Sequence, residues 1–240
     1  MSTRLDKLLA GLGYGSRREI QSLVRAGRVR LGEAQLTDAA GKIATEACAE
    51  LRVDGAPLDP LPGVVIMLNK PLGVTCSHKE EGPLVHDLLP ERWRRRDPQI
   101  SCVGRLDKDT TGLLLLTDDG ALLHTIISPK THVPKRYDAE LARPLRGDEA
   151  DIFAAGKLML HGETEPLRPG ILEVATPTRV ALTITEGRYH QVRRMFAAVG
   201  NHVLALRRDR IGGLALPDDL APGCYRVLEP SAVKTVLTAS

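Results

Sequence analysis

The N-terminal segment has the hydrophobic spacing of a short helix. Four leucines recur three or four residues apart within residues 4–12, and Gly13 follows as a stop signal. A second helix is expected directly afterwards, because Ser16 and Glu19 have the spacing of a capping box and Gly27 ends the next apolar stripe. The chain is therefore predicted to begin with two short amphipathic helices.

Short strands separated by turn residues follow these helices. The pattern favours strands at residues 28–31 and 50–53, which would complete a small module over residues 1–59. Residues 60–63, Pro-Leu-Pro-Gly, interrupt both helical and strand patterns and are predicted to be a linker. Residues 64–240 would then form a second, larger domain.

Strand-like runs dominate the larger domain. Apolar runs of strand length occur at residues 64–68, 100–103, 113–117, 136–141, 171–174 and 179–184, and helical spacing occurs near residues 119–127, 148–157 and 190–199. Because the strands outnumber the helices and do not alternate strictly with them, the pattern favours an α+β fold. We expect a mixed or antiparallel sheet, not a doubly wound parallel one.

Composition narrows the class of protein. With 240 residues, 42% of them hydrophobic, the chain can bury a core and is not expected to be disordered. It has no run of 18 apolar residues and its N-terminus is charged, so we expect a cytoplasmic protein without a membrane span. The cysteines lack C-x-x-C spacing, which favours reduced structural thiols over a metal site or disulfides. They are Cys48, Cys76, Cys102 and Cys224.

Basic residues gather in two stretches, although the formal net charge is only +3. Residues 1–30 carry seven basic and two acidic residues, and residues 186–212 carry six arginines and two acidic residues. Two basic stretches on a nearly neutral chain indicate two contact surfaces for a polyanion. The alternative interpretation is a pair of solvated helix faces.

The most polar motif lies between two predicted strands. Residues 104–112, Gly-Arg-Leu-Asp-Lys-Asp-Thr-Thr-Gly, are rich in turn-forming residues and predict a loop held by a rigid scaffold. Asp107 and Asp109 are its candidate reactive groups. A turn that merely connects the strands is the alternative.

Two chemistries use an aspartate in such a loop. As a nucleophile on phosphorus, Asp107 would take Asp109 as its acid, as in haloacid-dehalogenase-like phosphatases, with residues 147–151 resembling a magnesium-binding pair. Against this, Gly104 and Arg105 interrupt the strand that should lead into the nucleophile. As a lone carboxylate at a glycosidic bond, Asp107 would stabilise or capture positive charge at C1′ without a metal.

Residues 186–196 form a second motif, which opens a helix. Arg193 is the type of partner that keeps an aspartate ionised and oriented, although a basic amphipathic helix would give the same pattern. Tyr137 begins another strand after Lys135 and Arg136, where packing is its commonest role. With only seven aromatic residues, the chain offers no repeated platform for stacking bases, so any base would be captured singly.

Together these motifs resemble those of the RsuA-type ribosomal RNA pseudouridine synthases. The resemblance rests on residues 69–73, 104–107, 110–112, 135–137 and 186–195. The N-terminal module resembles an S4 RNA-binding domain through residues 4–9, 16–19 and 27–29, although Gly32-Glu33 stands where many S4 domains have Asn-Gly. The resemblance therefore covers nearly the whole chain.

Members of this family convert a uridine of folded RNA to pseudouridine, by breaking the N1 glycosidic bond and rejoining the sugar through C5. They use no metal or organic cofactor. The resemblance implies that Asp107 is the nucleophile or charge stabiliser at C1′, that Tyr137 stacks on the target base and acts in removing the C5 proton, and that Arg193 pairs with the carboxylate. Arg105 would help replace the flipped nucleotide in the RNA helix.

Residues 189–191, 200–203 and 210–213 resemble the small-subunit branch of the family, which modifies one uridine of 16S ribosomal RNA. The implied partner is this RNA, naked or in an assembling small subunit, and we expect a monomer. An RNA-binding protein without catalysis remains an alternative for the S4 module, but it leaves the Asp107 loop unexplained. RNA contacts are expected from Arg4, Lys7, Arg17, Arg18, Arg25, Arg28, Lys70, Arg105, Lys135, Arg136, Arg188, His190, Gln191 and Arg194.

Overall fold

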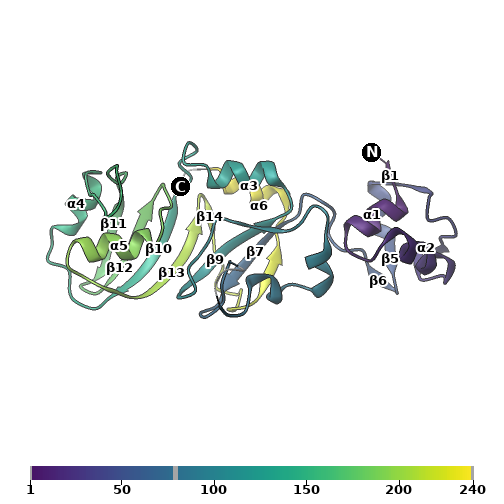
Figure 1. The fold of residues 1–240 in the computed structure, drawn as a ribbon, viewed down its shortest axis with the longest axis horizontal. Helices are drawn as coiled ribbons and strands as arrows, with labels where there is room; N and C mark the ends of the chain where they lie inside the picture. The colour runs from purple at the N-terminus through teal and green to yellow at the C-terminus, as the bar shows by residue number, and fades with distance from the viewer. Residues whose placement is uncertain (1, 78–80, 239–240) are drawn as a thin grey trace. The chain divides into compact units, whose positions relative to one another are not determined.

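The chain folds into two compact units (Figure 1). The computed structural model describes residues 2–77 and 81–238. Unit 1 comprises residues Met1–Val64 and Leu89–Ser101, and unit 2 comprises Val65–Leu88 and Cys102–Ser240. Each unit has its own hydrophobic core. None of the described helices is long and apolar enough to cross a membrane.

Unit 1 begins with the two helices that the hydrophobic spacing predicts. These are α1 (Leu5–Gly11) and α2 (Arg17–Arg25). The capping box is present, since the Ser16 hydroxyl accepts the Glu19 N–H at 3.3 Å and the Glu19 carboxylate accepts the Ser16 N–H at 2.6 Å. These two bonds satisfy backbone donors that the start of α2 would otherwise leave without partners.

Short strands complete unit 1. One sheet has the order β3-β2-β5-β6, and β1 pairs with β4 in a second. The bounds are β1 (Ser2–Arg4), β2 (Val29–Leu31), β3 (Ala34–Gln35), β4 (Lys42–Ala44), β5 (Leu51–Val53) and β6 (Ala56–Pro57), with a 3-10 helix η1 (Glu46–Glu50) before β5. The leucine stripe of α1 and the buried stripe of α2 share one core with β2 and β5.

Residues 89–101 belong to unit 1, whereas the sequence assigned them to the larger domain. This segment contains the 3-10 helix η3 (Glu91–Arg95). Arg92 donates to both carboxylate oxygens of Asp59, at 2.6 and 2.9 Å. The Asp97 N–H donates to the Gly11 carbonyl at 2.8 Å. These contacts form between residues far apart in the sequence, which is why hydrophobic periodicity could not place the segment.

A single mixed sheet organises unit 2. Its strands follow the order β11-β12-β10-β13-β9-β7-β15, with β14 on β13 and β8 on β9. Leaving aside β8 on β9, the described strand pairs of unit 2 are antiparallel except β13 with β9, which is parallel, so the expected mixed sheet is confirmed. The bounds are β7 (Val65–Lys70), β8 (Ser101–Val103), β9 (Thr110–Thr117), β10 (Lys135–Leu141), β11 (Ile171–Thr176), β12 (Arg179–Ile184), β13 (Val203–Ile211), β14 (Leu214–Ala215) and β15 (Tyr225–Val227).

Helices pack on both halves of this sheet (Figure 1). The sequence predicts α3 (Gly120–Ile127), α4 (Glu149–Ala154) and α5 (Gln191–Ala198), but not α6 (Pro230–Thr235) or the 3-10 helix η2 (Val85–Leu88). Phe153 of α4 meets Phe196 of α5 edge to face, with ring centroids 5.3 Å apart, in a core with β10 and β12. Residues of α3 and α6 join a second core with β7 and β9.

Strand β13 was missed because its sequence is highly charged. Arg207, Arg208, Asp209 and Arg210 occupy four consecutive positions of the strand. Their charges have partners on neighbouring strands, since Asp209 pairs with Arg136 of β10 and the Arg208 Nε donates to the Leu113 carbonyl of β9 at 2.9 Å. Hydrophobic alternation cannot detect a strand that is neutralised across the sheet in this way.

The parallel junction between β9 and β13 requires a glycine. Gly112 pairs with Arg208 and has a φ of +101°. A Cβ at residue 112 would lie 2.2 Å from the Arg208 carbonyl oxygen, which is far inside van der Waals contact. Since Thr110 follows the Asp107 loop directly into β9, this close approach also fixes the end of that loop.

We expect Gly112→Ala to destabilise unit 2 strongly. Gly147→Ala is a matched control, because Gly147 has a φ of +111° but no atom within 4 Å of the added Cβ. In the control, the free energy of unfolding should fall only by the cost of backbone strain, roughly 1–3 kcal/mol. In Gly112→Ala, the free energy of unfolding should fall by about 1–3 kcal/mol more, because the added methyl group overpacks the junction. Urea unfolding of the two variants measures the difference, and equal losses would show that β13 can move away from β9.

Candidate active site

A cavity of about 1150 Å³ opens within unit 2. Its lining includes the Asp107 loop, the end of α3, the beginning of β10, the loop at residues 163–169, the turn that leads from β12 into α5, and part of β13. Of the predicted site residues, the structure gathers seven here: Arg105, Asp107, Lys135, Tyr137, Arg188, His190 and Gln191. Segments far apart in the sequence thus meet around one carboxylate.

Asp107 lies half-buried in the loop between β8 and β9. Its backbone carbonyl accepts the Thr110 N–H at 3.0 Å, which closes a tight turn. Its carboxylate Oδ1 lies 3.3 Å from His190 Nε2. Burial raises the pKa of the Asp107 carboxyl above its ordinary value; the charges of His190, Arg193 and Arg105 oppose that rise, and Asp109 adds to it. The cavity therefore holds a carboxylate whose negative charge is disfavoured by burial and favoured by the neighbouring basic side chains.

Arg193 does not form the expected ion pair with Asp107. Its Nη2 lies 2.9 Å from the Asp109 carboxylate and donates to the Asp109 carbonyl at 3.1 Å, while Nη1 donates to the Val203 carbonyl at 2.8 Å. Asp109 lies two residues further along the same loop and is more exposed than Asp107, and its carboxylate is the one that contacts the Arg193 guanidinium. Arg193 thus ties the loop to α5 and β13 and acts on Asp107 through its charge.

The turn before α5 is fixed by a buried glutamate. Glu186 accepts the Arg168 N–H at 2.9 Å and the Gln191 side-chain N–H at 3.0 Å through Oε1, and its Oε2 accepts Arg188 Nε at 3.2 Å. The Arg188 N–H in turn donates to the Gln191 side-chain oxygen at 2.9 Å. Gln191 is therefore engaged inside the protein, where the sequence predicted an RNA contact.

Arg188 and Arg194 are also engaged inside the protein. Arg188 contacts Glu163 at 3.2 Å and donates to the Glu165 and Pro166 carbonyls at 2.8 and 2.7 Å. Arg194 donates to Glu163 at 2.8 Å and to the His161 carbonyl at 2.6 Å. Both arginines hold the wall of the cavity. These two side chains of the second basic stretch therefore belong to a structural network, where the sequence predicted a second surface for a polyanion.

Tyr137 and Lys135 project from β10 toward the cavity, and Arg208 of β13 lies beside them. Arg208 is 4% exposed; its Nη1 donates to the Tyr137 hydroxyl at 3.4 Å. Burial, followed by the charge of Arg208, lowers the pKa of Lys135 to about 8. Sequence reasoning missed Arg208 because it belongs to a charged run, and only the strand pairing shows which arginine faces inward.

Two further residues that the sequence predicted as RNA contacts are engaged within the protein. Lys70 is fully buried at the end of β7, where its ammonium donates to the Thr110 carbonyl at 2.8 Å and the Pro71 carbonyl at 3.1 Å. Arg136 points away from the cavity and pairs with Asp209 and with Glu173, the latter at 3.2 Å. Alternation along β10 explains this, because Arg136 and Tyr137 must face opposite sides of the sheet.

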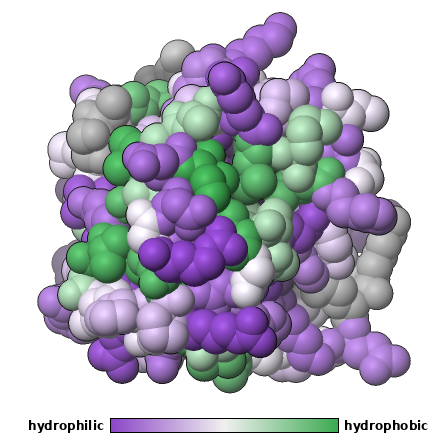
Figure 2. Space-filling model, turned by 90° about the vertical axis from the view of Figure 1, so that its left-hand side faces the viewer, coloured by the Kyte–Doolittle hydropathy of each residue, from purple (hydrophilic) through white to green (hydrophobic). Residues whose placement is uncertain are grey.

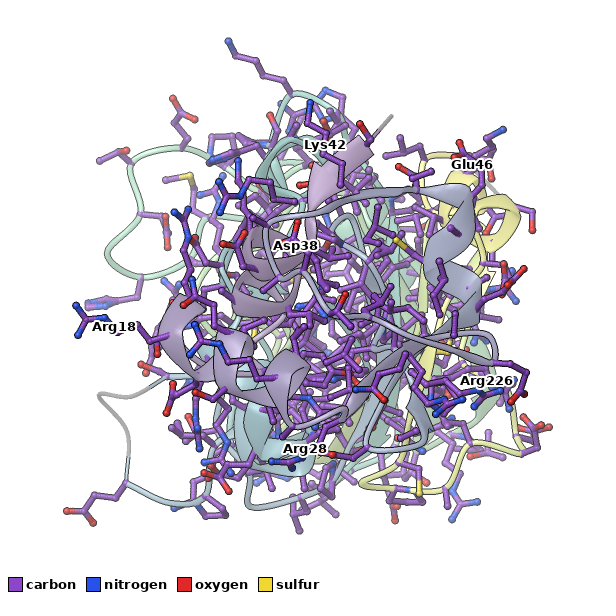
Figure 3. The ribbon with its side chains drawn as sticks, turned by 90° about the vertical axis from the view of Figure 1, so that its right-hand side faces the viewer. Arg18, Arg28, Asp38, Lys42, Glu46 and Arg226 are labelled. Atoms are coloured by element: carbon purple, nitrogen blue, oxygen red, sulfur yellow. The ribbon has the colours of Figure 1, made fainter. Side chains whose placement is uncertain are left out.

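Unit 1 presents the more accessible cations. Lys7, Arg17, Arg18 and Arg25 are exposed, and Figure 3 shows Arg18 extending away from the ribbon. Two other predicted contacts are partly engaged: Arg4 pairs with Asp6 at 2.7 Å, and Arg28 donates to Asp54 at 2.7 Å. The exposed group lies on and before α2, as the hydrophobic stripe predicted.

The arrangement gives no support to the phosphatase alternative. Asp109, its supposed acid, is held by Arg193. Glu149, from the supposed magnesium-binding pair, accepts the Arg146 and Gly147 N–H groups at 2.9 and 3.0 Å and so caps the start of α4. These contacts explain the acidic run at residues 147–151 as helix capping.

Comparisons with known proteins identify the family. The RNA pseudouridylate synthase family model matches residues 64–198, and the S4 domain model matches residues 3–44. The chain is 45% identical over 238 residues to the ribosomal small subunit pseudouridine synthase A of Escherichia coli K12, covering 98% of this chain and 100% of that protein. It is 41% identical to an uncharacterised RNA pseudouridine synthase of Bacillus subtilis, covering 94% of each.

A solved structure agrees with these matches. A crystal structure of a pseudouridylate synthase superimposes with a TM-score of 0.67 at 37% identity, covering 97% of this chain and 99% of that one. Similarity thus extends over both units, and the catalytic-family match spans the Asp107 loop, β10 and the start of α5. The chain belongs to the RNA pseudouridylate synthase family, an isomerase family, and carries an N-terminal S4 domain.

Proposed function

We propose that this protein converts one uridine of 16S ribosomal RNA to pseudouridine, at a site corresponding to uridine 516, with Asp107 as its catalytic carboxylate. The observation that carries the proposal is a single half-buried aspartate in a cavity large enough for a nucleoside. The small-subunit substrate is supported by the E. coli relative, whose name specifies the small ribosomal subunit. We further propose that the protein acts as a monomer in the cytoplasm.

The reaction requires the target uridine to leave the RNA stack. A stacked uridine hides C1′ and C5 from any side chain, and extrusion costs a few kcal/mol that contacts elsewhere must offset. Inside the cavity, Asp107 would face C1′ and stabilise or capture its positive charge as the N1 bond breaks. C5 then bonds to C1′, N1 gains a proton and C5 loses one, so the product is an isomer of the substrate.

Tyr137 is the group that we propose stacks on the extruded base and takes part in removing the C5 proton. Its hydroxyl is held by Arg208, and its ring packs partly against the core of unit 2, so its position is fixed before RNA arrives. Lys135 lies on the same wall, where burial and the nearby charge of Arg208 lower its pKa to about 8; an RNA phosphate brought into the cavity would offset the cost of that buried charge. Arg105, exposed at the cavity, is placed to occupy the vacated position in the RNA helix.

RNA affinity is assigned mainly to the S4 module, proposed as residues 1–59, followed by the linker at residues 60–63 and the catalytic domain at residues 64–240. The support is the exposed group Lys7, Arg17, Arg18 and Arg25, in contrast to the internally engaged arginines near α5. Because residues 89–101 pack with unit 1, cutting the chain at the linker would separate them from Asp59. Point substitutions are the cleaner test.

The substrate is tested by incubating the protein with 16S and 23S transcripts and mapping pseudouridine. We expect conversion of one uridine in 16S RNA, and the same conversion after chelation of divalent ions, provided that monovalent salt keeps the RNA folded. Conversion of 23S RNA alone would contradict the proposed substrate. Release of phosphate that requires magnesium, with no pseudouridine formed, would contradict the proposed reaction.

A triple variant, Arg17→Ala with Arg18→Ala and Arg25→Ala, tests the role of unit 1. Affinity for RNA should fall, and the slope of log affinity against log salt should flatten by about 0.7 to 0.9 for each RNA phosphate that is no longer neutralised. Turnover at saturating RNA should persist, because the cavity lies within unit 2. Arg226→Ala is the control, since Arg226 is half-exposed on unit 2 and pairs with Asp219. An unchanged salt slope in the triple variant would remove unit 1 from RNA binding.

A further inference from the structure

The turn before α5 exposes an aromatic ring beside the cavity. Tyr189 is 68% exposed, whereas the other described Phe, Trp and Tyr side chains are buried or only partly exposed. Its ring stacks on that of His190, with centroids 3.8 Å apart and planes inclined by 16°. Since His190 covers one face of the Tyr189 ring, most of the exposed area belongs to the other face and the edge.

The backbone that carries this stack is held on both sides. The Tyr189 carbonyl accepts Arg194 Nη1 at 3.1 Å, and the Arg188 carbonyl accepts the Gln191 N–H at 3.2 Å. His190 has a left-handed backbone, with a φ of 48°. That conformation is costly for a residue with a Cβ and persists only where its surroundings impose it. The exposed ring is therefore presented in a fixed position.

The stack is linked to the proposed reacting centre through one residue. His190 contacts the Asp107 carboxylate with its Nε2 edge and Tyr189 with its face. A base on the free face of Tyr189 would thus be separated from Asp107 by the Tyr189–His190 stack and would not be the base that reacts. It would belong to a nucleotide near the one that enters the cavity.

We propose that the free face of Tyr189 is a binding site for an unpaired nucleobase that flanks the target uridine in the RNA. Extruding one nucleotide deprives its neighbours of stacking partners, and a rigid aromatic ring at the rim of the cavity takes the place of the missing partner. Recognition by stacking accepts any base, because every base has a π-face. This inference rests on the proposed function, since it takes RNA as the ligand.

The test compares three variants in two measurements. RNA affinity is measured with Asp107→Asn also present, so that no turnover occurs. Single-turnover conversion is measured with Asp107 intact. Tyr189→Leu, which removes the ring, should weaken binding of a 16S fragment about 5- to 150-fold. Tyr189→Phe, which keeps the ring, should bind nearly as well as the parent. Ile171→Ala is the control; it removes a side chain that is 66% exposed on β11. Figure 2 looks onto the end of unit 2 at which Figure 1 labels β11, and hydrophobic side chains lie there among hydrophilic ones.

Salt separates stacking from charge. Tyr189→Leu should lower affinity equally at all salt concentrations, because every phosphate contact is kept, and conversion at limiting RNA should fall in step with affinity. Unchanged affinity in Tyr189→Leu, or an equal loss in Tyr189→Phe, would overturn the stacking site. If the unaltered protein bound the RNA but formed no pseudouridine, the proposed function would fail while the stacking result still stood.

Discussion

The proposed active site depends on keeping one carboxylate, that of Asp107, ionised in a partly buried place. Burial works against the charge of Asp107, and Asp109 two residues away adds to the difficulty. The structure offsets this with His190 in contact with the carboxylate and with the charges of Arg193 and Arg105 nearby. Because Arg193 is tied to Asp109, it reduces the repulsion from that neighbour as well as attracting Asp107. The rest of the cavity holds these groups in place.

Most arginines around the cavity build it and are not free to meet RNA. Arg188 and Arg194 fix the loop near Glu163, and Arg208 of β13 donates to the Tyr137 hydroxyl of β10 and to the Leu113 carbonyl of β9. The conformational entropy of these side chains is lost during folding. The wall of the cavity is therefore already ordered when the substrate binds. We therefore propose that RNA affinity comes mainly from exposed groups elsewhere, chiefly those on the helices of unit 1.

Local patterns predicted much of the fold, and long-range pairing explains the rest. The capping box at Ser16 and the loop around Asp107 could be recognised because neighbouring residues determine them. Strand β13 could not, since its charges are neutralised only by other strands. The burial of Lys70 has the same explanation: carbonyl partners, one of them 40 residues away, satisfy an ammonium that a sequence would place in solvent. Which aspartate Arg193 reaches is likewise a matter of three-dimensional geometry.

The most direct test is the ionisation of Asp107 itself, followed by carbon-13 NMR of the carboxyl groups and assigned with Asp107→Asn. The account predicts a midpoint above the ordinary value of about 3.9 for an aspartate. It also predicts a lower midpoint in Asp109→Asn, because a like charge is removed and Arg193 is released. A midpoint at or below the ordinary value that did not respond to Asp109→Asn would contradict it.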